Sequence, residues 1–443
     1  MSSHRSVHFI RRALAAPGEA AVALLRRFVR AEKQRPDALL PSQWFFFVGT
    51  ALLFCVPHEC WNNLFGVLFA VLALFIYWRD CAVYGMKPRS GIVLGFGVWL
   101  FLFWCLVITF RAEFPLASLR VALFYFAGFL LAYVAAALFD TAKARHLWVD
   151  LIFIMLTITA LYGLLRYALG RDTYLVPIGD TSLPRLASTM EHAINYSELI
   201  ALFFPLCLVR ALLPGQKKRR YILSAAALLV IFAALLLTYA RTGWLALGAA
   251  LVLLFVFWKP KWVWVLIPLA ALMVLIAPAS IRERLLSVFT FTNDSSSGRF
   301  VLWGECLRML RDHWLLGVGL GPENFTAVYD AYATGLLFFA IPHANMTYLD
   351  IFLSLGIVGF AGFALFFFGI FVRAGKALRT LPKERRWGIY AAVASLAGAA
   401  LAAVPEHIWF YPRVLYAWCL VYGLTLAFLP EASAPLRGEA HES

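Results

Sequence analysis

Three arginines and one histidine in this chain stand where their side chains could bind an anion and move a proton. Arg185, Arg241 and Arg299 fall in connections between apolar stretches, and His343 comes just before a long apolar stretch. A guanidinium matches phosphate oxygens with paired hydrogen bonds. Imidazole is the side chain that most often transfers protons near neutral pH. The four residues therefore predict a polyanion site with a base beside it.

The stretch that follows His343 carries a second titratable group. Pro342 is typical of a helix entry, so we expect His343 to open a helix and Asp350 to follow two turns later on the same face. A carboxylate buried there needs a partner. The alternative is that a histidine at a helix entry is purely structural. Weaker candidates of the same type are Glu191, His192, Glu406 and His407.

The composition excludes a water-soluble domain. Of the 443 residues, 63% are hydrophobic and 14% are charged, and the mean hydropathy is +0.79. Nearly every window of about 20 residues is apolar enough to enter a bilayer. The net charge of +15 does not indicate nucleic-acid binding, because the basic residues lie in short connections between apolar stretches. We therefore expect an all-α polytopic membrane protein.

Hydropathy predicts about twelve transmembrane helices. The connections between them alternate between strongly basic ones, such as 217–220 and 373–386, and ones with few basic residues. The positive-inside rule places the basic connections and both termini in the cytoplasm, and Arg185, Arg241 and Arg299 on the opposite face. The predicted spans are 41–57, 61–78, 91–110, 116–139, 147–169, 193–213, 221–240, 243–258, 261–278, 344–372, 387–404 and 412–429.

The chain is predicted to hold a single membrane domain with one large external insertion. This domain covers 41–429, between a basic cytoplasmic arm at 1–40 and a cytoplasmic tail at 430–443. The external segment 279–343 is too long to be a bare connector. The seven cysteines lack metal-ligand spacing, and Cys55 and Cys60 flank one outer loop where they could pair.

Within the insertion, apolar residues recur with helical spacing. Trp303, Leu307, Leu310 and Trp314 are three or four residues apart, which predicts an amphipathic helix in the membrane interface with its aromatic face in lipid. Arg299 opens this pattern after a Ser-rich turn. Free backbone N–H groups, the helix dipole and the guanidinium would together form an anion site. The alternative is that Arg299 only anchors the helix near lipid phosphates.

Arg241 lies between two apolar stretches with almost no connecting loop. Its guanidinium must therefore lie at or just inside the bilayer edge, at a cost of a few kcal/mol unless it snorkels or is paired. It is either a snorkelling interface residue or a ligand for an anion. The glycines at 317, 319 and 321 imitate a nucleotide-binding loop, but neither a preceding strand nor a Walker lysine accompanies them. They predict a turn that ends the interfacial helix.

The order of these motifs resembles the O-antigen ligase and polymerase superfamily of bacterial envelopes. The resemblance covers roughly 185–375, and the segment 185–195 resembles the element that precedes a helix in that group. The motifs that carry it are Arg-Thr-Gly-Trp at 241–244, Ser-Gly-Arg-Phe at 297–300, Gly-Val-Gly-Leu-Gly-Pro-Glu-Asn-Phe at 317–325, and His343 ahead of Tyr-Leu-Asp at 348–350.

Members of this superfamily are membrane glycosyltransferases of the GT-C class that take a glycan from undecaprenyl pyrophosphate on the periplasmic side. The resemblance implies that Arg241 and Arg299, with Arg185, bind the pyrophosphate and that His343 is the base. Many members carry a second polar residue directly after this histidine, where this chain has Ala344. A mechanism with two adjacent imidazoles is therefore not expected. The supporting residues are Glu191, His192, Asn195, Asn345, Tyr348 and Asp350.

The implied reaction is the transfer of O-polysaccharide to lipid A–core oligosaccharide at the periplasmic face of the inner membrane. External carboxylates do not cluster with metal-ligand spacing, so we expect transfer without a metal or cofactor. Direct attack on the anomeric carbon opposite the diphosphate should invert its configuration. Alternatives that share the donor are an O-antigen polymerase and a protein O-oligosaccharyltransferase. A polytopic transporter or lipid flippase is the alternative of another class. It would predict charges paired near the bilayer midplane or broken helices.

Overall fold

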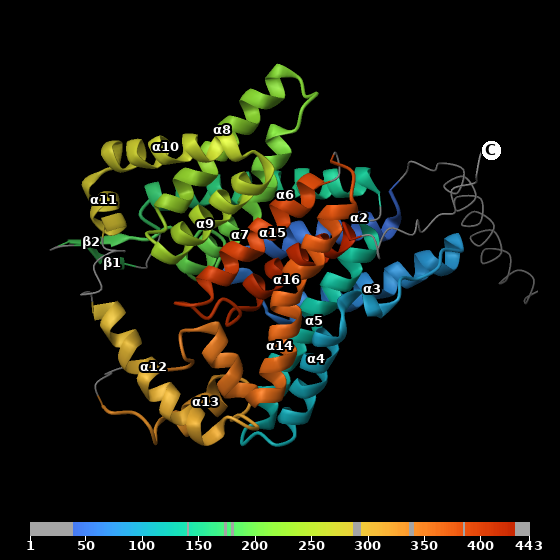
Figure 1. Ribbon diagram of the computed structural model, residues 1–443. Coiled ribbons are helices and arrows are strands. Elements are labelled where there is room, and N and C mark those ends of the chain that lie inside the picture. The colour runs from blue at the N-terminus through green and yellow to red at the C-terminus, as the bar shows by residue number, and fades with distance from the viewer. Residues whose placement is uncertain are drawn as a thin grey trace, which may run out of the picture.

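The computed structural model is a bundle of helices with one short β-hairpin at its side (Figure 1). The structure describes residues 39–139, 141–171, 175–178, 181–286, 294–335, 341–383 and 386–429. The predicted cytoplasmic tail and nearly all of the predicted basic arm lie outside these residues.

Each of the twelve predicted spans coincides with a helix. In the described part of the chain, seven helices are long and apolar enough to cross a membrane, namely α3, α5, α6, α7, α8, α9 and α14, and α2, α4 and α15 are shorter apolar helices. The all-α polytopic membrane fold is thus confirmed. The helices are α2 (Pro41–Cys55), α3 (Leu64–Tyr84), α4 (Phe96–Thr109), α5 (Pro115–Leu138), α6 (Ala142–Ala168), α7 (Ala193–Leu212), α8 (Lys218–Leu236), α9 (Arg241–Trp258), α10 (Val263–Ile276), α14 (Thr347–Thr380), α15 (Arg386–Ala402) and α16 (Pro412–Ala427).

The centre of the bundle is formed by α5, α7 and α16. Every residue of α16 is buried, and it packs along α5. A Cβ added at Gly423 would lie 2.4 Å from the carbonyl oxygen of Ala132, so the two backbones touch at this point. Small residues allow such close packing where lipid provides no hydrophobic driving force between helices. By contrast, α8 is mostly exposed and faces the surroundings of the bundle.

One short hairpin departs from the all-α expectation. Strand β1 (Leu175–Ile178) pairs antiparallel with β2 (Thr181–Pro184) in the connection between α6 and α7. Single 3-10 turns occur at His58–Cys60, Gly91–Leu94 and Pro260–Trp262. The nearby Cys55 and Cys60 are free thiols, so the pairing considered for them does not occur in the structure.

The described residues of the insertion contain three helices, α11 (Ala279–Leu286), α12 (Asp294–His313) and α13 (Pro322–Tyr329). Figure 1 shows α12 and α13 at one end of the bundle, near α14. The predicted amphipathic helix exists, and Leu307 and Trp314 are exposed as expected. Trp303 does not face outward, however. It is half-buried against a cluster shared with α13 and α14, and its Nε1 donates to the carbonyl of Ala344 at 3.1 Å.

The predicted start of this helix is wrong. α12 begins at Asp294, so the Ser-rich segment is helical and Arg299 lies in the second turn. The free N–H groups at the helix start therefore lie away from Arg299 and do not complete an anion site with it.

The glycine run forms the expected turn and also joins the insertion to the bundle. Gly317, Gly319 and Gly321 all have positive φ angles. The run passes a break in α14 at Gly356, where φ is 64° and ψ is −168°. The backbone groups freed by the break bond to residues of the insertion: Val318 N donates to Leu353 O at 2.9 Å, Gly319 N to Ser354 O at 3.0 Å, and Ile357 N to Trp314 O at 2.8 Å. Buried backbone groups are thereby satisfied, as a membrane protein requires.

We expect Gly356→Ala to destabilise the protein. The φ and ψ angles of Gly356 belong to a region that is essentially limited to glycine, and a residue with a side chain is strained there by about 1–3 kcal/mol. Its Cβ would also lie 2.4 Å from the carbonyl oxygen of Leu315. The matched control is Gly369→Ala in the same helix, where an added Cβ meets nothing within 4 Å. In thermal unfolding of the purified protein, equal Tm values for the two variants would contradict this role of the break.

Candidate active site

Three arginines lie around one carboxylate, Glu406, in the loop between α15 and α16, and a fourth arginine lies close to these three. Arg299 of α12 binds it directly, with its Nη2 2.5 Å from Oε1. Arg185 and Arg241 lie close enough to act on the charge of Glu406, and Arg284 of α11 is in turn close to the other three arginines. All three predicted arginines thus meet in space, although their positions span more than a hundred residues.

The turn between α8 and α9 gathers three of these arginines. Arg241 is the first residue of α9, directly after the turn. The Nε of Arg185 donates to the carbonyl of Thr238 at 2.8 Å, and the Nε of Arg284 donates to the carbonyl of Tyr239 at 3.3 Å. The carbonyl oxygens of the turn therefore orient the guanidiniums of Arg185 and Arg284 beside that of Arg241. Tyr239 has a φ of 51°, which is part of this tight geometry.

The electrostatics of the cluster fit an anion site. Burial lowers the pKa of Arg185 and lowers that of Arg284 to about 10, and the neighbouring guanidiniums contribute to both shifts. Burial raises the pKa of the Glu406 carboxyl, whereas the charges of Arg299, Arg185 and Arg241 oppose that rise. Closely spaced cations away from bulk water repel one another and would be stabilised by a polyanion.

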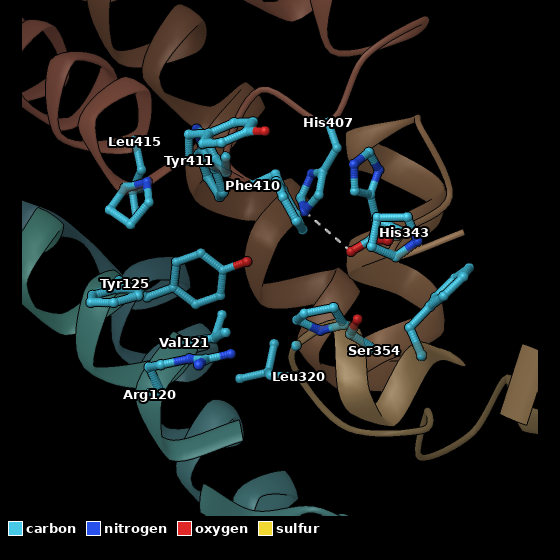
Figure 2. A pocket seen from close by; sticks show the side chains of 18 of the residues that line it. Arg120, Val121, Tyr125, Leu320, His343, Ser354, His407, Phe410, Tyr411 and Leu415 are labelled. Atoms are coloured by element: carbon cyan, nitrogen blue, oxygen red, sulfur yellow. Dashed lines mark ion pairs between the residues drawn. The ribbon is translucent and has the colours of Figure 1, made fainter. Parts of the chain in front are cut away.

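A cavity of about 310 Å³ lies next to the cluster, between α5, α13, α14 and the loop that precedes α16 (Figure 2). Its wall combines aromatic rings with polar groups, whereas the four arginines of the cluster do not line it. The lining residues that matter most for its chemistry are Arg120, Tyr125, His343, Asp350, His407 and Phe410.

His343 lines this cavity but does not open a helix as predicted. Helix α14 begins only at Thr347, because the chain bends at Asn345, whose φ is 49°. The backbone N–H of Asn345 donates to Nδ1 of His343 at 3.1 Å. Burial, with a smaller effect of His407, lowers the pKa of His343 to about 4. The imidazole is therefore neutral near pH 7, with its Nδ1 lone pair bonded to the N–H of Asn345.

Asp350 has the partner that its burial requires. Its Oδ2 lies 3.2 Å from Nε2 of His407, and its Oδ1 accepts from the backbone N–H of Ala344 at 2.9 Å. Thr347 fixes the same loop, since its backbone N–H donates to the carbonyl of Glu406 at 3.1 Å. The start of α14 thus binds the loop that carries Glu406 and His407, and the side chains of these two neighbouring residues point to different parts of the site. Glu406 joins the arginines, and His407 joins the cavity.

The structure separates the predicted supporting residues. Asn345 and Asp350 lie at the site. Tyr348 does not, because its hydroxyl donates to the carbonyl of Ala400 at 2.7 Å and its ring packs on phenylalanines of α14. Glu191 pairs with the buried Arg413 at 3.2 Å.

His192 and Asn195 lie at the start of α7. The ring of His192 is 5.6 Å from that of Tyr411, and the charge of Arg185 reaches it. Asn195 is buried within the helix. Sequence reasoning missed Arg284 altogether and ranked His407 low. The sequence gives no sign of either role, because Arg284 reaches Arg241, and His407 reaches Asp350, only in the folded protein.

The class of protein follows from this fold and site. It is a multi-pass membrane protein with a half-buried arginine cluster beside a cavity that is lined by a histidine. Residues 225–364 match the family model described as O-antigen ligase, and this stretch includes Arg241, Arg284, Arg299, His343 and Asp350. This match supports membership of the O-antigen ligase and polymerase superfamily, whose members are membrane enzymes of the glycosyltransferase type. A search of curated protein sequences found no significant match.

We expect Glu406→Gln to strengthen anion binding at the arginine cluster. A unit charge about 4 Å from a cation contributes on the order of 4 kcal/mol at an effective dielectric constant of about 20. Removal of the carboxylate should therefore tighten the binding of inorganic pyrophosphate at least about tenfold, as measured by calorimetry on the purified protein. The control is Glu59→Gln, which removes a carboxylate paired with Arg166 instead. Weaker binding by Glu406→Gln would mean that the carboxylate holds Arg299 in place rather than occupying an anion position.

Proposed function

We propose that the protein is an O-antigen ligase that transfers O-polysaccharide from undecaprenyl pyrophosphate to lipid A–core oligosaccharide. The observation that carries the proposal is the position of His343. It lines a cavity suited to an acceptor sugar and lies within electrostatic reach of Arg299. We therefore propose that His343 lies between the arginine cluster, which would bind the leaving group, and the cavity, which would bind the nucleophile.

The donor diphosphate would bind at the arginine cluster. Arg185, Arg241 and Arg299 are the predicted ligands, and Arg284 adds a fourth cation from α11. A lipid diphosphate is a weakly basic leaving group, so it needs charge stabilisation more than it needs a proton. Forked guanidiniums provide this stabilisation with geometry that matches phosphate oxygens. The diphosphate would displace the carboxylate of Glu406 from Arg299.

The acceptor sugar would bind in the cavity on the other side of His343. Aromatic rings such as Tyr125 and Phe410 offer apolar faces to sugar rings, and polar side chains there can bond to sugar hydroxyls. In a direct displacement the nucleophile approaches opposite the leaving group. A nucleophile in this cavity would face a diphosphate at the arginine cluster from the opposite side, because the cavity lies beside the arginines but is not lined by them.

The reaction is a single displacement. The acceptor oxygen forms a bond to the anomeric carbon of the donor, and the bond from that carbon to the diphosphate oxygen breaks with its electron pair moving to the diphosphate. His343 takes up the hydroxyl proton as the new bond forms, which contributes roughly 10²–10⁴-fold to the rate. The anomeric configuration is inverted, and neither a metal nor a cofactor takes part in the proposed step.

The nearest alternative is an O-antigen polymerase, since family membership is common to both activities. It would use a second lipid-linked repeat as acceptor in the same cavity, and a protein O-oligosaccharyltransferase would use a polypeptide there. The broken helix that a transporter predicts does occur, at Gly356. The backbone groups that the break exposes are hydrogen-bonded to the insertion, which favours a break that fixes the insertion in place over one that moves during transport.

The proposal places the site at the periplasmic face of the inner membrane, with residues 279–343 outside and both termini inside. It rests on the alternation of basic connections along the chain.

We expect Arg241→Lys and Arg299→Lys each to lower the transfer rate by about tenfold or more while the protein still inserts and folds. Lysine keeps the charge but loses the planar fork that binds two phosphate oxygens. The measurement is the ligation rate with lipid-linked O-antigen and lipid A–core in proteoliposomes. Arg308→Lys is the matched control, because Arg308 is an exposed residue of α12 that bonds to the carbonyl of Tyr332. Wild-type rates in both cluster variants would leave these arginines as interface residues.

His343→Gln separates a base from a structural histidine. Glutamine keeps hydrogen-bonding capacity and approximate size, so donor binding should remain while the transfer rate falls by about 10²–10⁴-fold. His313→Gln, at the end of α12, is the control for the loss of an imidazole in the insertion. Donor affinity and ligation should be measured on the same preparations, with each acceptor supplied separately. Substantial ligation by His343→Gln would refute the base role, and extension of the lipid-linked repeat alone would identify a polymerase.

A further inference from the structure

A second imidazole lies beside His343, supplied by a distant part of the chain. The ring centres of His343 and His407 are 5.4 Å apart, and both residues line the cavity. Figure 2 shows them on the same wall, with the ion pair from His407 to Asp350 drawn as a dashed line. The residue after His343 is Ala344, so this chain lacks a polar neighbour in sequence but has one in space.

The hydrogen bonds of His343 determine which of its nitrogens carries the proton. Because Nδ1 accepts from the backbone N–H of Asn345, the neutral ring carries its proton on Nε2. A ring in this state has a single lone pair, which is already in use. To take a hydroxyl proton on Nδ1, His343 must exchange that bond and pass its Nε2 proton to another group, or else become an imidazolium at a site where burial disfavours the charge.

His407 has the complementary arrangement. Its Nε2 lies 3.2 Å from Oδ2 of Asp350, so the carboxylate binds the Nε2 proton and leaves the lone pair on Nδ1. That Nδ1 is buried and has no hydrogen-bond partner among the residues that the structure describes. A buried polar atom without a hydrogen-bond partner calls for a functional explanation, and here it lies next to a second imidazole.

We propose that His407, oriented by Asp350, receives the proton that His343 releases when His343 takes the proton of the acceptor hydroxyl. This inference rests on the proposed glycosyl transfer. In the step, the hydroxyl O–H bond breaks and its proton binds Nδ1 of His343. The two nitrogens are not hydrogen-bonded in the structure, so a rotation of the neighbouring rings first brings them into contact, and the Nε2 proton of His343 then moves to Nδ1 of His407. The first ring thus stays neutral, and the second becomes an imidazolium paired with Asp350.

The surroundings of His407 favour this division of roles. Burial lowers the pKa of His407 to about 3, so the ring is neutral before the reaction, and the same burial opposes its protonation. Once formed, the imidazolium would lie against the carboxylate of Asp350, which offsets the cost of a buried charge. The ring of Phe410 is 6.0 Å from that of His407 and adds a polarisable face. Positive charge would thereby form away from the arginines that bind the leaving group.

The test compares two nucleophiles on His407→Gln. With lipid A–core as acceptor, we expect kcat to fall by about 10²-fold or more while the KM for the lipid-linked donor stays within about twofold of wild type. Azide is the second nucleophile. As an anion it has no proton to give up, so formation of the glycosyl azide from the same donor should proceed at the wild-type rate. A loss of both reactions would mean that His407 is only structural, and ligation at the wild-type rate would also refute the relay.

A measurement on the wild-type protein avoids any dependence on how the variant folds. Two protons move together in the proposed step. Under conditions where transfer limits the rate, a plot of the ligation rate against the deuterium fraction of the solvent should therefore be curved. A straight line would indicate one moving proton and would refute the relay. If the wild-type protein forms neither the ligated product nor the glycosyl azide, the proposed function itself fails. His313→Gln serves again as the control.

Discussion

The mutual repulsion of four guanidiniums is the constraint on which the site depends. Arg185, Arg241, Arg284 and Arg299 lie close together in a protein that offers little water to screen them. Two kinds of partner make this arrangement possible, namely the carbonyl oxygens of the turn between α8 and α9 and the carboxylate of Glu406. The cluster is therefore preorganised for an anion but partly neutralised until one arrives.

The start of α14 links this cluster to the proton chemistry. Thr347 and Asp350 hold the loop that carries Glu406 and His407, so two neighbouring residues serve the two sides of the site. Further along the same helix, the break at Gly356 fixes the insertion, and with it α12 and Arg299, to the bundle. One helix thus sets the distance between the proposed places of the leaving group and the base. In direct displacement this distance must be correct within about an ångström.

Much of the fold could be predicted from the sequence because a bilayer leaves few choices. Each predicted span coincides with a helix, since an apolar run of suitable length satisfies its backbone groups only as a helix. Helix boundaries were less predictable. Asp294 and the serines that follow begin α12 before Arg299, and Asn345 delays α14 beyond His343. The left-handed backbone of Asn345 accounts for the later start of α14, and hydropathy registers neither helix start.

The sequence by itself determined that the chain is a membrane protein and that Arg185, Arg241, Arg299 and His343 are its candidate chemical groups. Composition, the alternation of basic connections and the order of the motifs are all local properties of the chain. Only the tertiary structure decided that Arg284 joins the arginines and that His407 pairs with Asp350, while Tyr348 turns away. Such contacts join segments that are distant in sequence. They depend on how helices pack and which backbone groups remain to be satisfied, and no local pattern contains that information.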